Sequence, residues 1–436
     1  MRIEEISTIV DTKLLKIAEI SKNNRKETFD NLIRFVNKDT LRKCFEEVDG
    51  KKAKGIDKVS KEEYGLQLEQ NLEELITRMK AMQYRPQPVK RVNIPKGDGK
   101  TRPLGISTFE DKLVQMQIHK ILEAIYEPIF LSCSYGFRPK KSCHNAVEDL
   151  YQYLDKNKVE IIIDVDLEGY FNTIDHKTLV MFLEHKIKDL TLIRYIVRML
   201  KAGIMEKENF SISDEGVPQG SICSPILANI FAHYVIDLWV TITLPKEILG
   251  KVKMFRYADD MVICLEKKED AEVVKTLLDE RLTKFGLRMN KEKTKDVSFN
   301  KRDERSGTKQ EMFDFLGFTF YLGRTRKGIV IPKVRTKKKS FKNKLQNAKQ
   351  WIIEVKDKLK LKAIWEIYIS KIRGHIQYYG VSFNFDMVDK FVQEANKVMF
   401  KYLNRRSQRK SFNWEQFTLF MKAHPLPKIQ IKHRLF

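Results

Sequence analysis

Short apolar strands that lead directly into aspartates constrain this chain more than any other feature. Ile161–Val165 is an apolar strand that ends at Asp166. Residues 254–257 and 261–265 form two further apolar segments, and a turn with two aspartates separates them, which is the pattern of a β-hairpin. Because apolar strands are buried, these carboxylates are predicted to emerge together at the edge of a core.

Such a group of carboxylates is electrostatically unfavourable without a cation. Like charges about 4 Å apart repel by roughly 4 kcal/mol at an effective dielectric of 20. Magnesium resolves the conflict, since it binds a few carboxylates together with phosphates. Two such ions roughly 3.5–4 Å apart support phosphoryl transfer. The Asp259-Asp260 turn alone is weak evidence, because turns favour aspartate. Asp164, two residues before Asp166, is interpreted as a structural residue.

The remaining pattern alternates helical and strand-like stretches. The first 80 residues are expected to be helical, and a strand-like stretch at 84–95 precedes a turn at Gly97-Asp-Gly99. A helix is expected at 109–127 and a strand at 313–320. The chain is therefore predicted to have an α+β fold.

A helical period begins at Ser340. Its apolar residues step by three and four positions, namely Phe341, Leu345, Ala348, Ile352, Val355 and Leu359. Lysines repeat every seven residues beside this stripe, at Lys342, Lys349 and Lys356, and Lys360 continues the row. A helix with one buried edge and one lysine-lined edge can pack on a neighbour and face phosphates. Two more helices are expected at 361–379 and 386–404.

Size and composition indicate two or three lobes with real cores. The chain has 436 residues, which is too long for one ordinary domain. Of these residues 42% are apolar, enough to form hydrophobic cores. Its five cysteines are scattered and never form a C-x-x-C pair, which favours a reducing cytosol over a disulfide scaffold or a structural zinc site. No run approaches about 18 apolar residues, so no membrane partner is expected.

The positive charge is concentrated at the C-terminal end. Residues 321–436 hold 28 Lys and Arg against 7 Asp and Glu, and so carry 21 of the 24 net positive charges. Lysines that serve solubility alone need not be so localised. The distribution therefore favours a nucleic-acid partner over a well-solvated surface without a partner.

An ordered series of motifs resembles the reverse transcriptases encoded by bacterial group II introns, and the resemblance spans roughly residues 50–436. The polymerase portion contains Ile94-Pro-Lys with Thr101-Arg-Pro-Leu-Gly-Ile106, Ser134-Tyr-Gly-Phe-Arg-Pro139, Asp166-Leu-Glu-Gly-Tyr-Phe171 with Ile174-Asp-His176, Gly216-Val-Pro-Gln-Gly-Ser with Ser224-Pro-Ile-Leu-Ala-Asn229, Phe255-Arg-Tyr-Ala-Asp-Asp260, Gly286-Leu-Arg-Met-Asn-Lys-Glu-Lys-Thr294 and Phe315-Leu-Gly-Phe318. Beyond it, Arg373-Gly-His-Ile-Gln-Tyr-Tyr-Gly380 and Leu403-Asn-Arg-Arg-Ser-Gln408 resemble the thumb, or maturase, region.

The resemblance implies a right-hand polymerase with an antiparallel palm sheet packed with helices. Residues 1–84 would form a helical N-terminal extension and the start of the fingers, and residues 85–322 the fingers and palm. Residues 323–404 would form a helical thumb, and residues 405–436 a short basic tail. The implied activity is RNA-directed DNA synthesis with two magnesium ions in the bacterial cytoplasm, in association with the nucleoid.

The resemblance also implies roles for single residues around the metal ions. Asp166, Asp259 and Asp260 would hold the metals, with the carbonyl of Leu167 as a further ligand. Lys293, in preference to Lys291, would protonate the departing pyrophosphate as a general acid.

Further residues would bind the incoming nucleotide. Lys96 and Arg102 would grip its triphosphate. Phe171 would lie under its sugar and exclude a 2′-hydroxyl, although a core phenylalanine remains an alternative and neighbouring Tyr170 complicates the assignment. Gln219 and Gly220 would contact the template and the nucleotide.

The C-terminal quarter would bind RNA template, DNA primer and a structured intron RNA. The residues expected to contact nucleic acid are Lys342, Lys349, Lys356, Lys360, Arg405 and Arg406. Tyr378 and Tyr379 are interpreted as core residues in preference to base-stacking ones. No DNA-cleaving domain is expected, because this region has no cysteine and only three separated histidines.

Three functions remain open at this point. The chain is interpreted first as an enzyme that copies RNA and helps its intron to splice and move. The alternatives are an RNA-binding splicing cofactor with vestigial polymerase activity, which the intact aspartates disfavour, and a domesticated reverse transcriptase for host defence. A viral RNA-dependent RNA polymerase is disfavoured by Phe171 and by the Gln219-Gly pattern.

Overall fold

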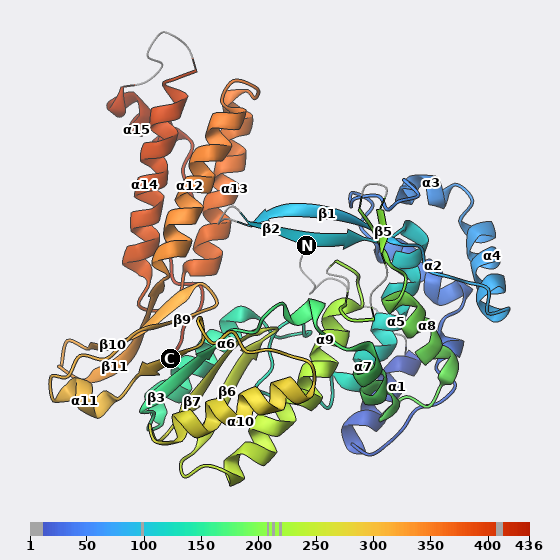
Figure 1. Cartoon of the computed structure of the whole chain (residues 1–436). Coiled ribbons are helices and arrows are strands. Elements are labelled where there is room, and N and C mark those ends of the chain that lie inside the picture. The colour runs from blue at the N-terminus through green and yellow to red at the C-terminus, as the bar shows by residue number, and fades with distance from the viewer. Residues whose placement is uncertain (1–11, 97–99, 207–208, 212–213, 218–219, 407–412) are drawn as a thin grey trace. The chain divides into compact units, whose positions relative to one another are not determined.

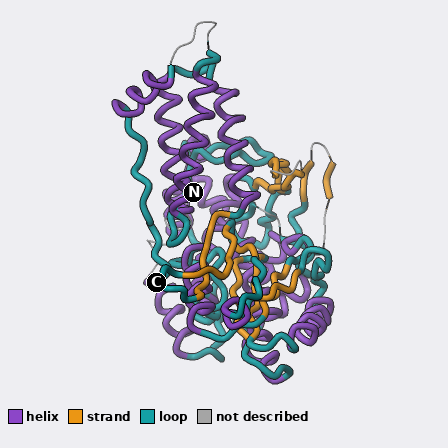
Figure 2. Tube along the Cα trace, turned by 90° about the vertical axis from the view of Figure 1, so that its left-hand side faces the viewer, coloured by secondary structure: helices purple, strands orange, loops and turns teal. Residues whose placement is uncertain are grey.

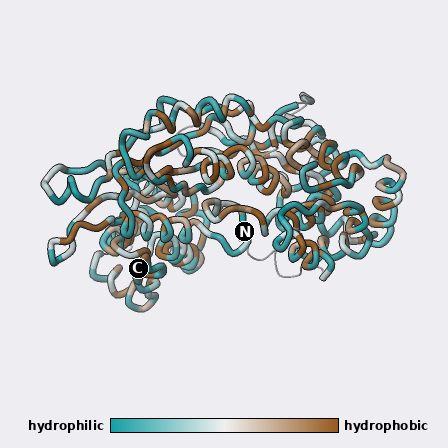
Figure 3. Tube along the Cα trace, turned by 90° about the horizontal axis from the view of Figure 1, so that it is seen from below, coloured by the Kyte–Doolittle hydropathy of each residue, from teal (hydrophilic) through white to brown (hydrophobic). Residues whose placement is uncertain are grey.

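The computed structural model describes residues 12–96, 100–206, 209–211, 214–217, 220–406 and 413–436. Helices make up 51% of the chain and strands 16%, which confirms the predicted mixture of helix and sheet. Apolar and polar residues alternate along the tube in Figure 3, as they do in amphipathic helices when one face packs on a core.

The described strands form three sheets. The first has the order β2-β1-β4-β5, from β1 (Val89–Lys96), β2 (Lys100–Ile106), β4 (Ile204–Glu206) and β5 (Asn209–Ser211). The second has the order β6-β7-β3-β8, from β3 (Ile161–Val165), β6 (Val252–Tyr257), β7 (Asp260–Leu265) and β8 (Lys295–Ser298). The third has the order β11-β10-β9, from β9 (Phe313–Phe315), β10 (Phe318–Arg324) and β11 (Val330–Thr336).

The chain divides into two compact units. The first comprises Met1–Ser142, Val165–Ile263 and Glu269–Lys295. Its helices are α1 (Thr12–Asn23), α2 (Lys38–Glu47), α3 (Lys61–Gly65), α4 (Leu68–Lys80), α5 (Phe109–Tyr126), α7 (His176–Glu184), α8 (Leu190–Leu200), α9 (Ser224–Ala232) and α10 (Asp270–Lys284), together with the short 3-10 or π segments η2 (Ile33–Phe35), η3 (Tyr170–Asn172), η4 (His233–Asp237), η5 (Trp239–Thr243) and η6 (Leu244–Lys246). The antiparallel hairpin of β1 and β2 also belongs to this unit (Figure 1).

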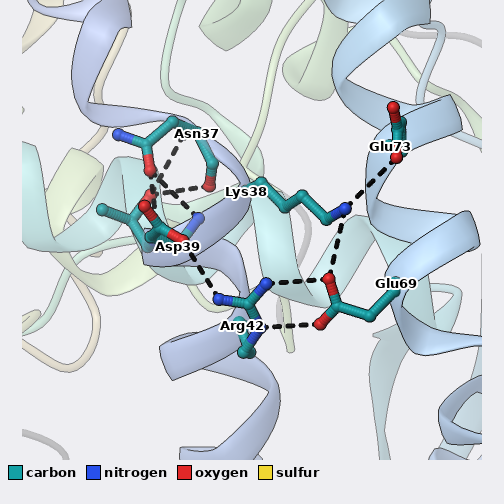
Figure 4. A network of polar contacts seen from close by, with 7 residues as sticks. Asn37, Lys38, Asp39, Arg42, Glu69 and Glu73 are labelled. Atoms are coloured by element: carbon teal, nitrogen blue, oxygen red, sulfur yellow. Dashed lines mark hydrogen bonds and ion pairs between the residues drawn. The ribbon is translucent and has the colours of Figure 1, made fainter.

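Helix α2 illustrates how local sequence sets an element and attaches it to its neighbour. The side chain of Asn37 accepts hydrogen bonds from the backbone N–H groups of Asp39 and Thr40, which caps the start of the helix. Arg42 of α2 then donates to both carboxylate oxygens of Glu69 on α4, at 2.7 and 2.8 Å (Figure 4). The capped helix is thereby held against α4 by an exposed bidentate pair.

A long apolar helical run crosses the first unit from Ser224 to Lys246. It begins as α9 and continues through two π-helical segments, η4 and η5. By length and composition alone this run could cross a membrane, yet 72% of its most apolar window is buried inside the protein. It serves as a core helix of the first unit.

The second unit comprises Cys143–Asp164, Cys264–Lys268 and Asp296–Phe436. Its helices are α6 (Cys143–Lys156), α11 (Lys301–Arg305), α12 (Lys338–Val355), α13 (Leu361–Tyr379), α14 (Phe385–Leu403) and α15 (Trp414–Ala423). Helices α12, α13 and α14 lie side by side (Figures 1 and 2). Ile352, Ile364 and Ala395 are almost wholly buried among them.

Two features of the second unit differ from the sequence-based expectations. The stretch 313–320, predicted as one strand, is a hairpin of β9 and β10, because Leu316 and Gly317 have positive φ angles of 49° and 80° and reverse the chain. The predicted basic tail contains α15, and His433 pairs with Val381 in an isolated β-bridge. The domain boundaries all stay predictions; the one at residue 322 falls within β10.

Candidate active site

A tight hairpin presents the second group of aspartates. Strand β6 ends at Tyr257 and β7 begins at Asp260, so Ala258 and Asp259 form the turn. Ala258 has a φ of 59°, in the left-handed region that costs a non-glycine residue about 1–2 kcal/mol. A turn that keeps such a conformation is held by its surroundings, and strain of this kind concentrates at functional sites.

The end of strand β3 is fixed by a second segment of the first unit. The N–H of Asn290 donates to the carbonyl of Asp166 at 2.8 Å, and the N–H of Glu168 donates to the carbonyl of Arg288 at 2.9 Å. Leu167 and Met289 form an antiparallel bridge between these bonds. The backbone that carries Asp166 is therefore paired on one side, and its direction is set.

Asp166 and Asp259 line one cavity of about 440 Å³ in the first unit. The other residues that line it are Thr101, Arg102, Pro103, Leu167, Glu168, Gly169, Tyr170, Phe171, Asn290 and Lys293. Five of the residues proposed from sequence for the metal and nucleotide sites thus share this cavity with Asp166, although they come from four separate stretches of the chain. A cavity of this size with a few convergent charged groups is the usual form of an active site.

Two lysines that follow Asn290 lie in different places. Lys293 lines the cavity, and its Nζ is 3.5 Å from Oδ1 of Asp166. Lys291 is instead paired with Asp279 of α10, at 2.8 Å. Both Lys293 and Asp166 are substantially exposed, so this contact is weak in the free protein. Of the two lysines, Lys293 is the one placed to reach a ligand beside Asp166.

Phe171 and Tyr170 point in different directions from the same short 3-10 segment. Tyr170 is buried, and its hydroxyl donates to the carbonyl of Ala228 at 2.6 Å. Burial raises the pKa of Tyr170, so the hydroxyl stays a donor. Phe171 is also buried, but its ring meets that of Phe137 edge-on at 6.4 Å. The side chain of Tyr170 is thus anchored in the core, and Phe171 is the better candidate for a contact with a sugar.

The residues of the cavity fit magnesium ions that are held partly by protein carboxylates and partly by substrate phosphates. In the described part of the chain, no three Asp, Glu, His or Cys side chains gather closely enough to hold a metal ion. Asp260, the third predicted ligand, is not among the residues that line the cavity. Magnesium is commonly held by one or two carboxylates together with substrate phosphates. Asp166 and Asp259 meet that requirement for ions that arrive with a nucleotide.

The other predicted nucleotide-binding residues are only partly described. Lys96 pairs with Lys100 in the register of β1 and β2, and its side chain lies outside the described residues, as does all of Gln219. Gly220 has a φ of 112°, and a Cβ at this position would lie 2.5 Å from the carbonyl oxygen of Gly105. Only glycine fits there, because the chain approaches β2 so closely.

The predicted nucleic-acid contacts of the second unit have different surroundings. Lys342 and Lys360 are exposed and Lys349 is half-buried. Lys356 is paired with Asp357 and donates to the carbonyl of Arg405 at 3.3 Å, so it fastens the end of α12 to the end of α14. Arg406 donates to the carbonyl of Leu359 at 2.9 Å, whereas Arg405 is exposed over the ring of Tyr402.

Sequence analysis did not single out every residue that this geometry brings forward. Asn290 lines the cavity and was present only as one letter of a longer motif. Phe137, with a φ of 56°, supports the ring of Phe171 from a segment more than thirty residues away. Arg256, buried behind the aspartate turn, was interpreted as part of an apolar strand. Periodicity does not reveal such contacts, since each joins segments that are distant in sequence.

Residues 94–320, more than half of the chain, match the family of reverse transcriptases, or RNA-dependent DNA polymerases. The chain therefore belongs to this family and is an RNA-directed DNA polymerase. It is 28% identical to the group II intron-encoded protein LtrA of Lactococcus lactis subsp. cremoris, over 87% of this chain and 75% of that protein. The predicted resemblance to group II intron-encoded reverse transcriptases is thereby confirmed.

Two further relatives match shorter segments. Protein YkfC of Escherichia coli K12 is 35% identical over 41% of this chain and 48% of its own length. An uncharacterized 91 kDa protein in the cob intron of Schizosaccharomyces pombe is 39% identical over 37% of this chain and 20% of its own length.

Proposed function

We propose that this reverse transcriptase joins nucleotides at the cavity shared by Asp166 and Asp259, with two magnesium ions and with Asp260 as a third acidic residue of the site. The single observation that supports this proposal is the shared cavity itself, since the two aspartates are more than ninety residues apart in sequence. When bound, the ions would activate the primer hydroxyl and stabilise the leaving oxygen.

The chain's own residues would bind and orient the substrates. Arg102, on the cavity wall, supplies a bidentate cation for the triphosphate, and Lys96 of the same hairpin would add a point charge. Phe171 would lie under the deoxyribose. Lys293, beside Asp166, would give a proton to the departing pyrophosphate. Gln219 and Gly220 would contact the template and the nucleotide.

The fingers, palm and thumb of a right-hand polymerase are part of this proposal. The hairpin of β1 and β2 would belong to the fingers, the sheet of β6, β7, β3 and β8 to the palm, and helices α12–α14 to the thumb. The concentration of positive charge in residues 321–436 supports a thumb that lies along a nucleic-acid duplex.

A structured intron RNA is the proposed additional partner, and help in its splicing and mobility the proposed additional role. The relation to a group II intron-encoded protein supports this, as does the likeness to a protein encoded in a fungal cob intron. The bacterial cytoplasm, beside the nucleoid, is the proposed place of action because template, primer and target DNA meet there.

Replacing both turn aspartates tests the catalytic assignment. Asp259→Ala combined with Asp260→Ala should abolish extension of a DNA primer on an RNA template, because the metals would lose two of their three proposed carboxylate ligands. Binding of the same template–primer, measured by fluorescence anisotropy, should be largely unchanged. Asp214→Ala is the matched control, since this exposed aspartate of the first unit pairs with Lys201 at the surface. Synthesis by the double variant would show that the site is elsewhere.

A further inference from the structure

A buried arginine lies directly behind the aspartate turn, and the proposed mechanism does not use it. Arg256 of β6 is only 1% exposed. Its guanidinium forms a bidentate pair with Asp237, which is 0% exposed, through Nε at 2.7 Å and Nη2 at 2.6 Å. Burial alone would lower the pKa of Arg256, but the pair with Asp237 raises it, so the side chain stays charged.

The remaining donors of Arg256 reach the turn and its supports. Nη1 donates to the carbonyl of Ala258 at 2.9 Å and to Oδ1 of Asn229 at 3.2 Å. Nη2 donates to Oγ of Ser134 at 2.7 Å. One buried side chain thus links the core helix, the segment at Ser134 and the residue that precedes Asp259.

The carbonyl of Ala258 is the significant partner in this network. Ala258 is in the left-handed region, and the orientation of its peptide group sets where the next residue, Asp259, points. Gly136 packs closely against the same residue, since a Cβ at Gly136 would lie 2.5 Å from the nitrogen of Ala258. Asn229 holds Gly136 in place by donating to its carbonyl at 2.7 Å. The strained turn is therefore clamped from two sides.

The acidic partner is supplied by an irregular element. Asp237 ends the π-helical segment η4 (His233–Asp237). π-Helical turns are rare in proteins, and those that occur are often found at functional sites. A buried ion pair gives little net stability compared with apolar packing, and the best-attested reason to retain one is that it specifies a conformation. Here the conformation that the pair contacts is the aspartate turn.

We propose that Arg256 is a positioning residue for the polymerase reaction: anchored by Asp237, it holds the Ala258 peptide so that the carboxylate of Asp259 faces Asp166. This inference rests on the proposed role of Asp259 at the catalytic cavity. Arg256 itself would touch neither nucleotide nor metal.

Arg256→Lys is the sharpest test, because lysine keeps the charge beside Asp237 but lacks the planar fork that reaches Ala258. The kcat of primer extension is expected to fall about 10- to 100-fold, with the KM for template–primer unchanged, because a reacting group is misplaced and not lost. Amide hydrogen exchange in residues 255–262 of the metal-free protein should become faster. The midpoint of thermal unfolding should also fall, because buried acceptors at Asn229, Ala258 and Ser134 lose a donor, so kcat and exchange are measured well below that midpoint.

Arg281→Lys is the matched control. Arg281 of α10 donates to the carbonyls of Val235 and Tyr234, both at 3.0 Å, and so holds the same π-helical segment through other atoms. The Arg281→Lys variant should leave amide hydrogen exchange at residues 255–262 and the kcat of primer extension unaltered. If Arg256→Lys does not fold, Asn229→Ala removes one support of both Arg256 and Gly136 and should give the same signature in weaker form.

The outcomes separate this inference from the proposed function. A folded Arg256→Lys protein with normal kcat and normal exchange at 255–262 would overturn the positioning role, as would an equal response from Arg281→Lys. Loss of synthesis in Asp259→Ala would still support the catalytic cavity in that case. Synthesis by Asp259→Ala would instead overturn the cavity assignment, whatever Arg256 does.

Discussion

At the scale of single residues, Phe171 is the residue proposed to make the site selective for deoxynucleotides. Its ring lines the cavity and is supported edge-on by Phe137 at 6.4 Å and by Tyr170 at 5.6 Å. Phe171→Ala should admit ribonucleotides, because the ring no longer fills the space of a 2′-hydroxyl. Discrimination between dNTP and NTP, measured as a ratio of kcat/KM values, should fall by about 10- to 200-fold.

The substitution also removes buried volume, which costs about 3–5 kcal/mol for a phenylalanine. Phe182→Ala shares that cost, since Phe182 of α7 is 7% exposed, but Phe182 does not line the cavity. Phe137→Ala should reduce discrimination partially by loosening the ring of Phe171. Unchanged sugar selectivity in Phe171→Ala would assign this residue to the core.

The sequence predicted individual candidate site residues where their chemistry and the local strand pattern pointed to the same place. Asp166 and Asp259 were expected together because one follows a buried strand and the other lies in the turn between two such strands, and they share a cavity. Arg256 and Asp237 were not anticipated. A charged residue inside an apolar strand shows no sign of its partner, and that partner lies on a helix 19 residues away in sequence. Pairings of this kind depend on tertiary packing, which periodicity does not encode.

At the scale of elements, two glycines of the same helical region should respond in opposite ways to alanine. Gly374 lies inside α13 and is exposed, and a Cβ added there would have no neighbouring atom within 4 Å. Gly374→Ala should raise the free energy of unfolding by about 0.5–1 kcal/mol, because glycine loses more backbone entropy in a helix. Thermal or urea unfolding would measure the change.

Gly380, the residue after α13, provides the contrast. A Cβ there would lie 2.5 Å from the carbonyl oxygen of Ile376 and 2.8 Å from that of Gln430, so Gly380→Ala should destabilise the protein. Both effects concern the second unit. A lower unfolding midpoint for Gly374→Ala would contradict the assignment of this position as an unobstructed helix interior.

Elements themselves were the most predictable level of the structure. Helix α13 spans the predicted residues 361–379, and α14 begins and ends one residue before the predicted range. Long amphipathic stretches are determined by their own period, so distant contacts change them little. The exception at 313–320 depends on Leu316 and Gly317, where a two-residue turn interrupts an otherwise continuous apolar run.

At the scale of the whole molecule, the division into two compact units was not visible in the sequence. The first compact unit takes three separate stretches of sequence, and so does the second. Composition shows linkers only where domains follow one another along the chain, and here the chain passes between units more than once. The concentration of positive charge, in contrast, could be predicted from the sequence, because counting charged residues requires no knowledge of contacts.

That charge should be measurable as a salt effect on RNA binding. Lys342, Lys349 and Lys360 replaced together by glutamine should weaken binding of a structured RNA and reduce the slope of log K against log salt by roughly 1 per lost phosphate contact, so by about 2–3. Lys356 is left in place because its contacts with Asp357 and Arg405 make it a structural residue. Filter binding between about 50 and 200 mM salt measures the slope.

The control variant has glutamine in place of three exposed lysines of the first unit, Lys43, Lys51 and Lys52. It should leave the slope of log K against log salt unaltered. Because both triple variants lose the same net charge, a difference between them reports location and not total charge. If the C-terminal lysines also serve an intron RNA, only the first variant should slow splicing of that RNA in vitro. Normal splicing with an unchanged salt slope would remove these lysines from the proposed RNA surface and leave the polymerase cavity as the supported site.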